Sequence, residues 1–302
     1  MKKVLITGST GFLGRHLVKR LENDYDLLTP TSYELNVQDI VDLHKYIVEN
    51  SPDIIIHLAA VCGGIGANKE APADFFIKNS MMSINILSMS NYHKIDKLIT
   101  LGSVCSYPKF TEVPFKEENI WDGYPEETNA PYGIAKKSLL VGCRAYNKQY
   151  GDNFLHLIPV NMYGEYDNFN PDSSHVIPAL FEKFKKAKEN KDPFVEVWGD
   201  GSASREFLYA GDCANAIALA LENYNEPDPI NIGTGTEITI KDLVLKISKL
   251  FDYKGGIKYD TSKPNGQPRR CLDTTKAKEK FGFEAETSLD EGLEKTYNWY
   301  IA

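Results

Sequence analysis

Tyr132 and Lys136 lie four residues apart in the segment PYGIAK (131–136). In a helix this spacing places the phenol and the ammonium on one face, one turn apart. A neighbouring ammonium favours the phenolate, so we expect Lys136 to lower the pKa of Tyr132 from its ordinary value of about 10. A tyrosine of this kind passes a proton to or from a sugar or alcohol oxygen. Such pairs also arise by chance on exposed helices, so the rest of the chain must give this one its meaning.

A glycine-rich turn near the start of the chain predicts a dinucleotide site. The apolar strand 3–7 runs into GSTGFLG (8–14), and a helical apolar pattern comes directly after it. Without side chains at Gly8, Gly11 and Gly14, backbone N–H groups can approach a pyrophosphate at the positive end of that helix. A plain tight turn would have the same glycines. Three further elements at βαβ intervals favour the dinucleotide interpretation, namely a strand at 26–29, a helix at 37–49 and a strand at 54–60.

The end of the second strand usually selects between NAD and NADP. An acidic side chain there binds the ribose hydroxyl, and a basic one accepts the 2′-phosphate. Here residues 29–33 read TPTSY, with neither kind of side chain, and Arg15 is the nearest obvious cation. The residues themselves leave the choice of cofactor open.

The remaining elements predict an α/β fold with a doubly wound parallel sheet of the Rossmann type. A buried strand at 97–101 delivers Ser103 at its carboxyl end, where ligands bind in such sheets. The helix with Tyr132 continues to about Tyr150, and a strand is expected at 154–159. We assign residues 1–165 to a dinucleotide-binding domain. Residues 166–302 are expected to form a smaller substrate-binding region that partly returns to the main sheet, with helices at 175–189, 212–222, 240–250 and 289–300 and a strand at 194–198.

Composition and charge exclude several classes of protein. The 302 residues are 42% hydrophobic and 25% charged, as in ordinary globular proteins, and no apolar run approaches the ~20 residues of a membrane span. A net charge of −8 argues against general nucleic-acid binding, so an anionic ligand needs a local cluster of Lys and Arg. Five scattered cysteines, without Cys-x-x-Cys spacing, fit a reducing cytoplasm better than disulfides or a metal site.

The glycine loop, Ser103, Tyr132 and Lys136 together resemble the extended short-chain dehydrogenase/reductase family, over essentially the whole chain. Within it, the chain is most similar to the GDP-L-fucose synthases, which are GDP-4-keto-6-deoxy-mannose 3,5-epimerase/4-reductases. This narrower resemblance rests on the segments GGIGAN (63–68), PADF (72–75), GSVCSYPK (102–109), DNF (167–169), SHVIPAL (174–180), WGDG (198–201), REFL (205–208) and KPNGQPR (263–269).

The resemblance implies a role for each matching residue. Ser103, Tyr132 and Lys136 would serve hydride transfer: Ser103 binds the C4 carbonyl, Tyr132 protonates the alkoxide, and Lys136 holds the nicotinamide ribose. Cys105 and His175 would serve as the acid/base pair that inverts C3 and C5 before reduction. On residue type alone, each of these two is more often a structural residue. The remaining implied cofactor contacts are Phe12, Leu13, Pro159 and His175, beside the three glycines, Tyr132 and Lys136.

The family uses NADPH, so NADP(H) is favoured, and NAD(H) stays possible. Two departures weaken this preference: Ser9 and Thr10 stand where the fucose synthases carry a basic residue, and the end of the second strand lacks an arginine.

The resemblance implies that the substrate is a GDP-sugar. Charge-assisted contacts would hold its diphosphate, and the predicted substrate-binding residues are Asn161, Lys183, Trp198, Arg205, Lys263 and Arg269. Arg270 is a further cation of this region that could contact the diphosphate, and a solvated surface position is an equally good interpretation for it. The family also implies a homodimer.

Three alternatives remain beside a GDP-L-fucose-forming epimerase/reductase for surface polysaccharide. A GDP-4-keto-6-deoxy-heptose 4-reductase, with or without epimerase activity, would share the motifs, because a slightly larger sugar changes the pocket shape only. An NDP-sugar 4-epimerase or dehydratase would not need Cys105 and His175. A non-catalytic dinucleotide sensor on the same fold would be expected to lose Tyr132 or Lys136.

Overall fold

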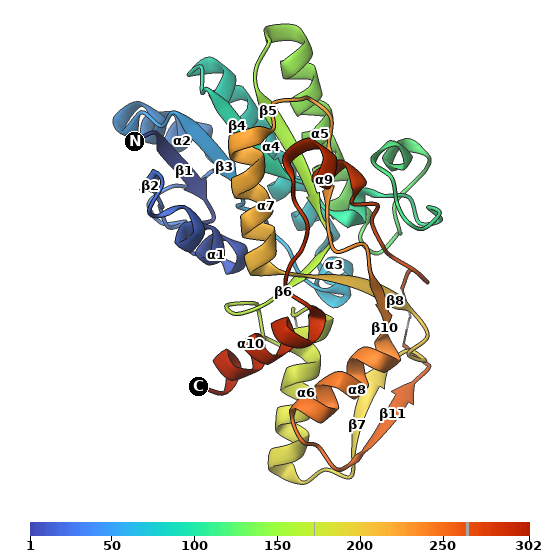
Figure 1. Ribbon diagram of the computed structural model, residues 1–302. Coiled ribbons are helices and arrows are strands. Elements are labelled where there is room, and N and C mark those ends of the chain that lie inside the picture. Colours follow the sequence, from blue (N-terminus) through green and yellow to red (C-terminus); the bar gives the residue numbers. More distant parts are fainter. Residues whose placement is uncertain (172, 264–265) are drawn as a thin grey trace.

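A parallel sheet of six strands forms the upper part of the molecule in the computed structural model, which describes residues 1–171, 173–263 and 266–302 (Figure 1). Its strand order is β2-β1-β3-β4-β5-β9, and every pairing is parallel. The order reverses between β1 and β3, where a doubly wound sheet opens a ligand crevice at the carboxyl ends of its strands. The predicted fold class is confirmed. The strands are β1 (Lys3–Thr7), β2 (Asp26–Leu28), β3 (Ile54–His57), β4 (Lys97–Leu101), β5 (Phe154–Pro159) and β9 (Ile230–Ile232).

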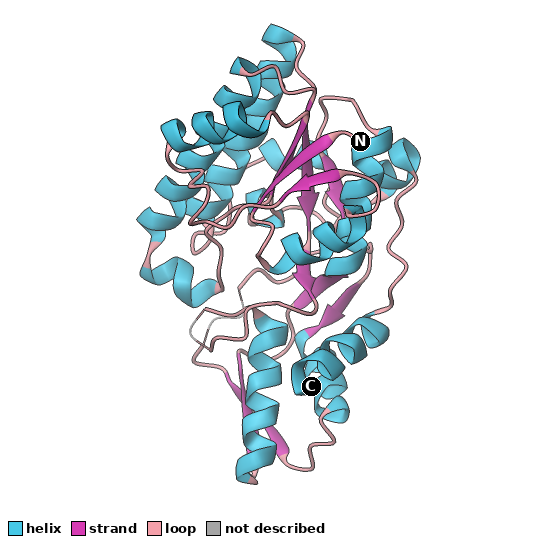
Figure 2. Ribbon diagram, turned by 90° about the vertical axis from the view of Figure 1, so that its left-hand side faces the viewer, coloured by secondary structure: helices cyan, strands magenta, loops and turns pink. Residues whose placement is uncertain are grey.

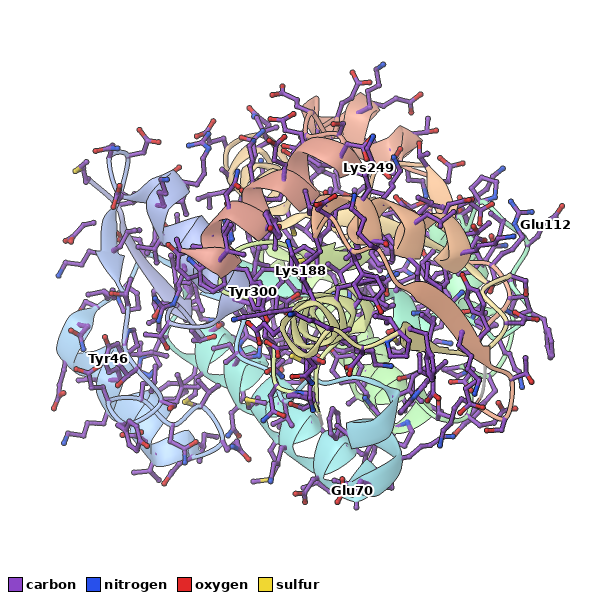
Figure 3. All side chains as sticks on the ribbon, turned by 90° about the horizontal axis from the view of Figure 1, so that it is seen from below. Tyr46, Glu70, Glu112, Lys188, Lys249 and Tyr300 are labelled. Atoms are coloured by element: carbon purple, nitrogen blue, oxygen red, sulfur yellow. The ribbon has the colours of Figure 1, made fainter. Side chains whose placement is uncertain are left out.

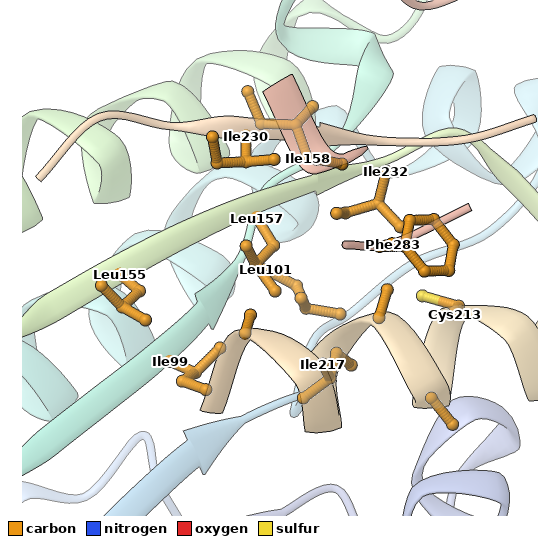
Figure 4. Close-up of a cluster of buried hydrophobic side chains, with 14 of the residues drawn as sticks. Ile99, Leu101, Leu155, Leu157, Ile158, Cys213, Ile217, Ile230, Ile232 and Phe283 are labelled. Carbon is orange, nitrogen blue, oxygen red and sulfur yellow. The ribbon is translucent and has the colours of Figure 1, made fainter. Parts of the chain in front are cut away.

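Helices cover both faces of this sheet because its strands carry apolar side chains on both sides. In β1, Val4 and Ile6 join the cluster under α1 and α7, whereas Leu5 joins the cluster under α2, α4 and α5. This two-sided burial is typical of a parallel sheet. Figure 4 shows the α7 side, where Ile99, Leu157 and Ile217 lie in one layer. The helices are α1 (Phe12–Leu21), α2 (Ile40–Asn50), α4 (Pro72–Tyr92), α5 (Ala130–Tyr150) and α7 (Ala210–Asn223).

The lower part of the molecule is a smaller region with short sheets (Figures 1 and 2). One described sheet has the order β10-β8-β6 and another pairs β11 with β7. Figure 3 views α6 nearly end-on, with its residue Lys188 and Tyr300 of α10 labelled near it. Lys188 donates to the Phe251 carbonyl, and Tyr300 donates to Glu182 of α6. These elements are β6 (Asn161–Tyr163), α6 (Val176–Asn190), β7 (Phe194–Trp198), β8 (Ser204–Tyr209), β10 (Glu237–Thr239), α8 (Ile240–Leu250), β11 (Gly256–Asp260) and α10 (Leu289–Ile301).

Short helices lie in loops at the carboxyl edge of the main sheet or beside it. They are α3 (Ile65–Glu70), η1 (Val104–Ser106), η2 (Glu117–Trp121) and α9 (Thr275–Phe281). The chain also re-enters the main sheet at β9, which pairs with β5, after α7 has crossed the sheet face. No helix in the described part of the chain has the length and apolar character to cross a membrane.

The periodicity of the sequence located strands β1 to β5 and β7 and helices α1, α2, α5, α6, α7, α8 and α10, and it did not locate β6, β8 to β11, α3, α4 or α9. Two differences have a clear physical reason. Helix α2 begins at Ile40 rather than at residue 37, because the Asp39 carboxylate caps it by accepting from the backbone N–H groups of Val41 and Asp42. Helix α4 was not predicted at all. Its buried positions include Asn79 and Asn85, whose side chains bond backbone groups of other segments, so the helix lacks a clean apolar stripe.

A buried carboxylate on β8 connects the two parts of the molecule. The Glu206 side chain is fully buried and accepts hydrogen bonds from the backbone N–H groups of Thr234, Gly235 and Leu272, the latter two at 2.8 and 2.7 Å. Burial raises the pKa of Glu206, and these three donors counteract that effect. Its backbone also bonds Arg270. One side chain therefore fixes β8, the turn after β9 and the segment before α9 relative to one another.

We expect Glu206→Ala to lower the free energy of unfolding by about 3–5 kcal/mol, because it leaves three buried N–H groups without an acceptor. Glu294→Ala, at an exposed position of α10, is the control and should change stability by less than about 0.5 kcal/mol. Urea unfolding measures both. Equal stability of the two variants would show that Glu206 does not hold these segments.

Candidate active site

The glycine loop presents bare backbone toward the crevice. Gly8 has φ +75°, and a Cβ there would lie 2.8 Å from the Ala59 nitrogen. A Cβ at Gly14 would collide with the carbonyl oxygens of Gly8 and Ser9. Helix α1 begins after Gly11, with no side chain capping its first N–H groups. A close backbone approach and a free positive helix end are what a pyrophosphate requires, so these residues fit a dinucleotide.

The region that would face the 2′ position of the adenosine ribose carries hydroxyl groups and an acid. Ser9 donates to the Pro30 carbonyl at 3.2 Å, which joins the glycine loop to the end of β2. Glu34 accepts from the backbone and the hydroxyl of Thr31. The Arg15 guanidinium turns back, donating to the Thr10 carbonyl at 3.0 Å and lying 5.1 Å from the centre of the Tyr166 ring.

Ser103, Tyr132 and Lys136 meet above the carboxyl end of β4. Ser103 follows β4 and caps η1, where its hydroxyl accepts from the Cys105 N–H at 3.1 Å. A Cβ at Gly133 would collide with the Cys105 carbonyl, so the absence of that side chain lets α5 pack directly on this turn. Lys136 donates to the Leu101 carbonyl at 3.1 Å, and its Nζ lies 5.9 Å from the centre of the Tyr132 ring. Both residues share one face of α5, as their spacing predicts.

The expectation that Lys136 lowers the pKa of Tyr132 is wrong for this arrangement. Burial raises the pKa of Tyr132 well above its ordinary value, with the negative forms of Cys62 and Cys105 acting in the same direction and only Ser103 opposing them. Burial also lowers the pKa of Lys136, to about 8. Desolvation of the phenol is the largest effect on the pKa of Tyr132, and the Lys136 ammonium, 5.9 Å from the centre of the ring, does not offset it. Tyr132 is therefore held as the neutral phenol, which is the form that can donate a proton.

Two buried histidines flank the base of this site. His57 ends β3 and bonds Thr7 at 2.8 Å, and His156 on β5 bonds Thr100 at 2.9 Å. Burial, with the Lys136 charge second, lowers the pKa of each to about 3. Both imidazoles are neutral at physiological pH and leave Lys136 as the cation beneath the crevice.

Cys105 lies next to Arg270, a residue that was not among the predicted substrate contacts. The Arg270 guanidinium is 3.8 Å from the Cys105 sulfur and 3.5 Å from Asn161 Oδ1. Its charge also reaches His175, whose pKa is lowered first by desolvation and then by Arg270. His175 stands at the start of α6, where its backbone caps the helix. The Arg270 guanidinium thus lies beside Cys105 and Asn161, and its charge acts on His175.

Of the other predicted substrate contacts, Lys183, Lys263 and Trp198 lie together, Arg205 lies near Arg270, and Arg269 lies apart at the surface. Trp198 is 54% exposed at the end of β7, and the ammonium groups of Lys183 and Lys263 lie 5.5 and 5.4 Å from the centre of its ring. Arg205 on β8 lies near Arg270, and burial together with that charge lowers its pKa to about 9. Arg269 instead points to the surface and forms an ion pair with Glu237. Pro264 and Asn265 of the predicted motif lie outside the described residues.

Arg270 and Asp167 were not among the predicted site residues, for different reasons. In an extended segment, neighbouring residues point to opposite faces, so only the fold shows that Arg270 rather than Arg269 faces the cleft. Asp167 follows β6 in the DNF segment and was noted only as part of the resemblance. Burial raises its pKa to about 7, and its Oδ2 has no hydrogen-bond partner among the described residues. The sequence signal that could have identified Asp167 is an acidic residue in the loop directly after a strand.

The chain resembles known proteins over its whole length. Residues 4–233 match the NAD dependent epimerase/dehydratase family. Over 311 aligned residues the chain is 39% identical to the GDP-L-fucose synthase of Escherichia coli (strain K12), with 99% of this chain and 97% of that protein covered. The chain belongs to the NAD dependent epimerase/dehydratase family. The predicted resemblance to GDP-L-fucose synthases is confirmed.

Solved structures of heptose-modifying enzymes share the fold closely. A GDP-6-OMe-4-keto-L-xylo-heptose reductase from C. jejuni matches with a TM-score of 0.93 and 28% identity, over 99% of this chain and 97% of that one. MlghC, the GDP-mannoheptose C4 reductase of Campylobacter jejuni, matches in its NADP-bound form with a TM-score of 0.91 and 30% identity, over 100% and 98%. The heptose alternative therefore has direct structural counterparts.

The two buried histidines predict how stability depends on pH. Their pKa values fall from 6.5 in the unfolded chain to about 3 when folded, so the folded state binds fewer protons and loses stability as the pH decreases below 6.5. Between pH 7 and pH 5 we expect each histidine to remove about 2 kcal/mol from the free energy of unfolding. His57→Asn should lose about half of this dependence, measured by urea unfolding at each pH. The same slope in variant and parent would contradict the neutral pair.

Proposed function

We propose that this protein is an NADP(H)-dependent epimerase/reductase that converts GDP-4-keto-6-deoxy-D-mannose to GDP-L-fucose. The observation that carries the proposal is the position of Cys105. It follows Ser103 in the turn under α5, and the Arg270 guanidinium, 3.8 Å from its sulfur, also acts electrostatically on His175. A plain reductase would need Ser103, Tyr132 and Lys136, without Cys105 and His175. An additional thiol and imidazole on the same cleft support a reaction that also moves protons on carbon.

The chemistry depends on the order in which the residues can act. A proton on a carbon next to the C4 ketone is acidic; Cys105 removes it as the C–H electron pair moves onto the ketone oxygen. His175 returns a proton to the carbon from the other face, which inverts the centre. Ser103 stabilises the negative charge on the oxygen by a hydrogen bond. A reduced nicotinamide, when bound, supplies the hydride to C4, and Tyr132 then gives its phenolic proton to the resulting alkoxide.

We further propose how the chain divides this work. Residues 1–165 hold the dinucleotide through Gly8, Gly11, Gly14 and Lys136. Residues 166–302 hold the GDP-sugar: the exposed ring of Trp198, with the ammonium groups of Lys183 and Lys263 near it, suits the guanine base, and Arg205 suits the diphosphate. Lys183, Lys263 and Arg205 thus provide the local positive charge that an anionic ligand requires in a chain of net charge −8.

A GDP-4-keto-6-deoxy-heptose 4-reductase is the second candidate, and the Campylobacter jejuni reductases are the observation that favours it. An NDP-sugar 4-epimerase or dehydratase is less well supported, because Cys105 and His175 would have no role.

We place the protein in the cytoplasm, since its five free cysteines suit a reducing compartment. We assign its product to surface polysaccharide biosynthesis.

The reaction can be tested with GDP-4-keto-6-deoxy-mannose and NADPH, by following cofactor oxidation and repeating the reaction in heavy water. We expect oxidation with deuterium at C3 and C5 of the product. Reduction without deuterium would leave a plain 4-reductase, and turnover of the heptose substrate alone would select the second candidate. If neither sugar is turned over with NADPH or NADH, the proposal is wrong.

Two variants separate the steps within that assay. Cys105→Ser should slow deuterium exchange by at least about 100-fold, because an alcohol is a far weaker acid than a thiol and loses its proton much less readily. Tyr132→Phe should abolish hydride transfer while exchange continues. Mass spectrometry of the sugar and NADPH absorbance read the two steps independently. Exchange at the normal rate in Cys105→Ser would remove this residue from its assigned role.

We also propose a homodimer, formed by an exposed apolar face of α4. Ile77, Met81 and Ile84 recur at helical spacing and are 50, 44 and 64% exposed, and Val141 of the adjacent α5 is 50% exposed. Contiguous apolar residues at the surface are typical of an interface between subunits.

Ile84→Asp should convert the dimer to a monomer, because the change would bury an unpaired carboxylate in that interface. Sedimentation velocity measures the mass. Val48→Asp, at an exposed position of α2, is the matched control and should remain dimeric. A monomeric parent protein, or a dimer unaffected by Ile84→Asp, would place the interface elsewhere or remove it.

A further inference from the structure

Arg270 is a buried guanidinium that is held by neutral amide groups. Only 8% of the residue is exposed. Its Nε and Nη2 each donate to Gln267 Oε1 at 3.2 Å, and Nη1 reaches Asn161 Oδ1 at 3.5 Å. Among the ion pairs of the described residues, which include a surface pair for the adjacent Arg269, none involves Arg270. Two amide oxygens orient the guanidinium without neutralising it.

Burying a charge without a counter-ion is costly, so the arrangement needs an explanation. The titratable and charged groups that face Arg270 come from three elements. Cys105 of η1 has its sulfur 3.8 Å away, His175 stands at the start of α6, and Arg205 lies on β8. Arg205 repels Arg270, and a protonated His175 would do so too. Of these groups, only Cys105 becomes an anion, and its sulfur lies 3.8 Å from the guanidinium.

We propose that Arg270 is the positioning residue that keeps Cys105 as a thiolate, ready to act as the base of the reaction. The guanidinium stabilises the negative sulfur by a charge-assisted hydrogen bond, and the two amides hold it at the required place. In the free protein the thiolate is the missing counter-ion. This explains why the buried cation is otherwise held by neutral amides.

The proposal completes the proton balance of the first chemical step. The thiolate takes the carbon-bound proton, so the C–H bond breaks, an S–H bond forms, and the electron pair moves to the ketone oxygen. The thiol then returns its proton to solvent, and Arg270 restores the thiolate. Arg270 disfavours protonation of His175, so the imidazolium is a ready proton donor whenever it forms.

The proposal relies on the proposed function only for the use of the thiolate, since its existence is a property of the protein without substrate. We therefore test it by alkylation with iodoacetamide from pH 5 to pH 10, without any sugar nucleotide, with the rate at each cysteine resolved by peptide mass spectrometry. The exposed Cys62 is an internal control in the same cleft. Cys143, Cys213 and Cys271 are buried and should stay unmodified.

We expect the pH midpoint for alkylation of Cys105 to lie below that of Cys62 in the parent protein. In Arg270→Gln the Cys105 midpoint should rise by about one pH unit, so that alkylation at pH 7 becomes about tenfold slower. Arg270→Lys should retain most of the low midpoint. Arg144→Gln, which removes an exposed guanidinium from α5, should change neither cysteine.

Either of two results would overturn the proposal. One is a Cys105 midpoint that is the same in Arg270→Gln and in the parent, with the Cys62 rate unchanged as a sign of correct folding. The other, which needs no variant, is a parent midpoint for Cys105 at or above that of Cys62. Both readouts are independent of the GDP-sugar assay. A protein that has the thiolate and fails to turn over the sugar would contradict the proposed function and leave this inference standing.

Discussion

The buried carboxylate of Glu206 is the interaction on which the cleft depends. It accepts three backbone N–H groups from the turn after β9 and from the segment that carries Arg270. The backbone of the same residue bonds the Asn161 side chain and the Arg270 carbonyl, each at 3.0 Å. Strand β8 thereby sets the positions of Arg205, Asn161 and Arg270 relative to β5 and the parallel sheet. A fully buried acid is stable here because backbone donors, rather than a cation, satisfy its charge.

The two sides of the cleft have opposite electrostatic designs. Around Ser103, burial keeps Tyr132, His57 and His156 neutral, and leaves Lys136 with a pKa of about 8. Around Cys105, Arg205 and Arg270 place two guanidinium groups near one thiol. A neutral phenol suits proton donation to an alkoxide, and positive charge suits an anion such as a thiolate. The acidic chain thus concentrates buried positive charge beside Cys105.

The sequence predicted the first five strands of the parallel sheet and the long helices other than α4, and it did not predict β9 or most of the strands of the smaller sheets. The bounds of β1, β4, β5 and β7 agree with the predicted ranges, because each is a short run of β-branched or apolar residues. Helix α4 escaped prediction because Asn79 and Asn85 are buried in it to bond other loops. The pKa of Tyr132 was predicted in the wrong direction, since spacing reveals a neighbouring charge and says nothing of desolvation.

By itself the sequence determined the glycine turn, the pairing of Tyr132 with Lys136 and the position of Ser103 after a buried strand. Each of these depends on contacts between residues close in the chain, so local spacing is sufficient. Only the tertiary structure decided that Cys105, Asn161, His175 and Arg270 share one cleft, and that Arg269 lies outside it. Those residues are far apart in the chain, and long-range strand pairing brings them together: β9 pairs with β5 in the parallel sheet, and β8 pairs with β6 in a separate sheet. No local pattern encodes these pairings.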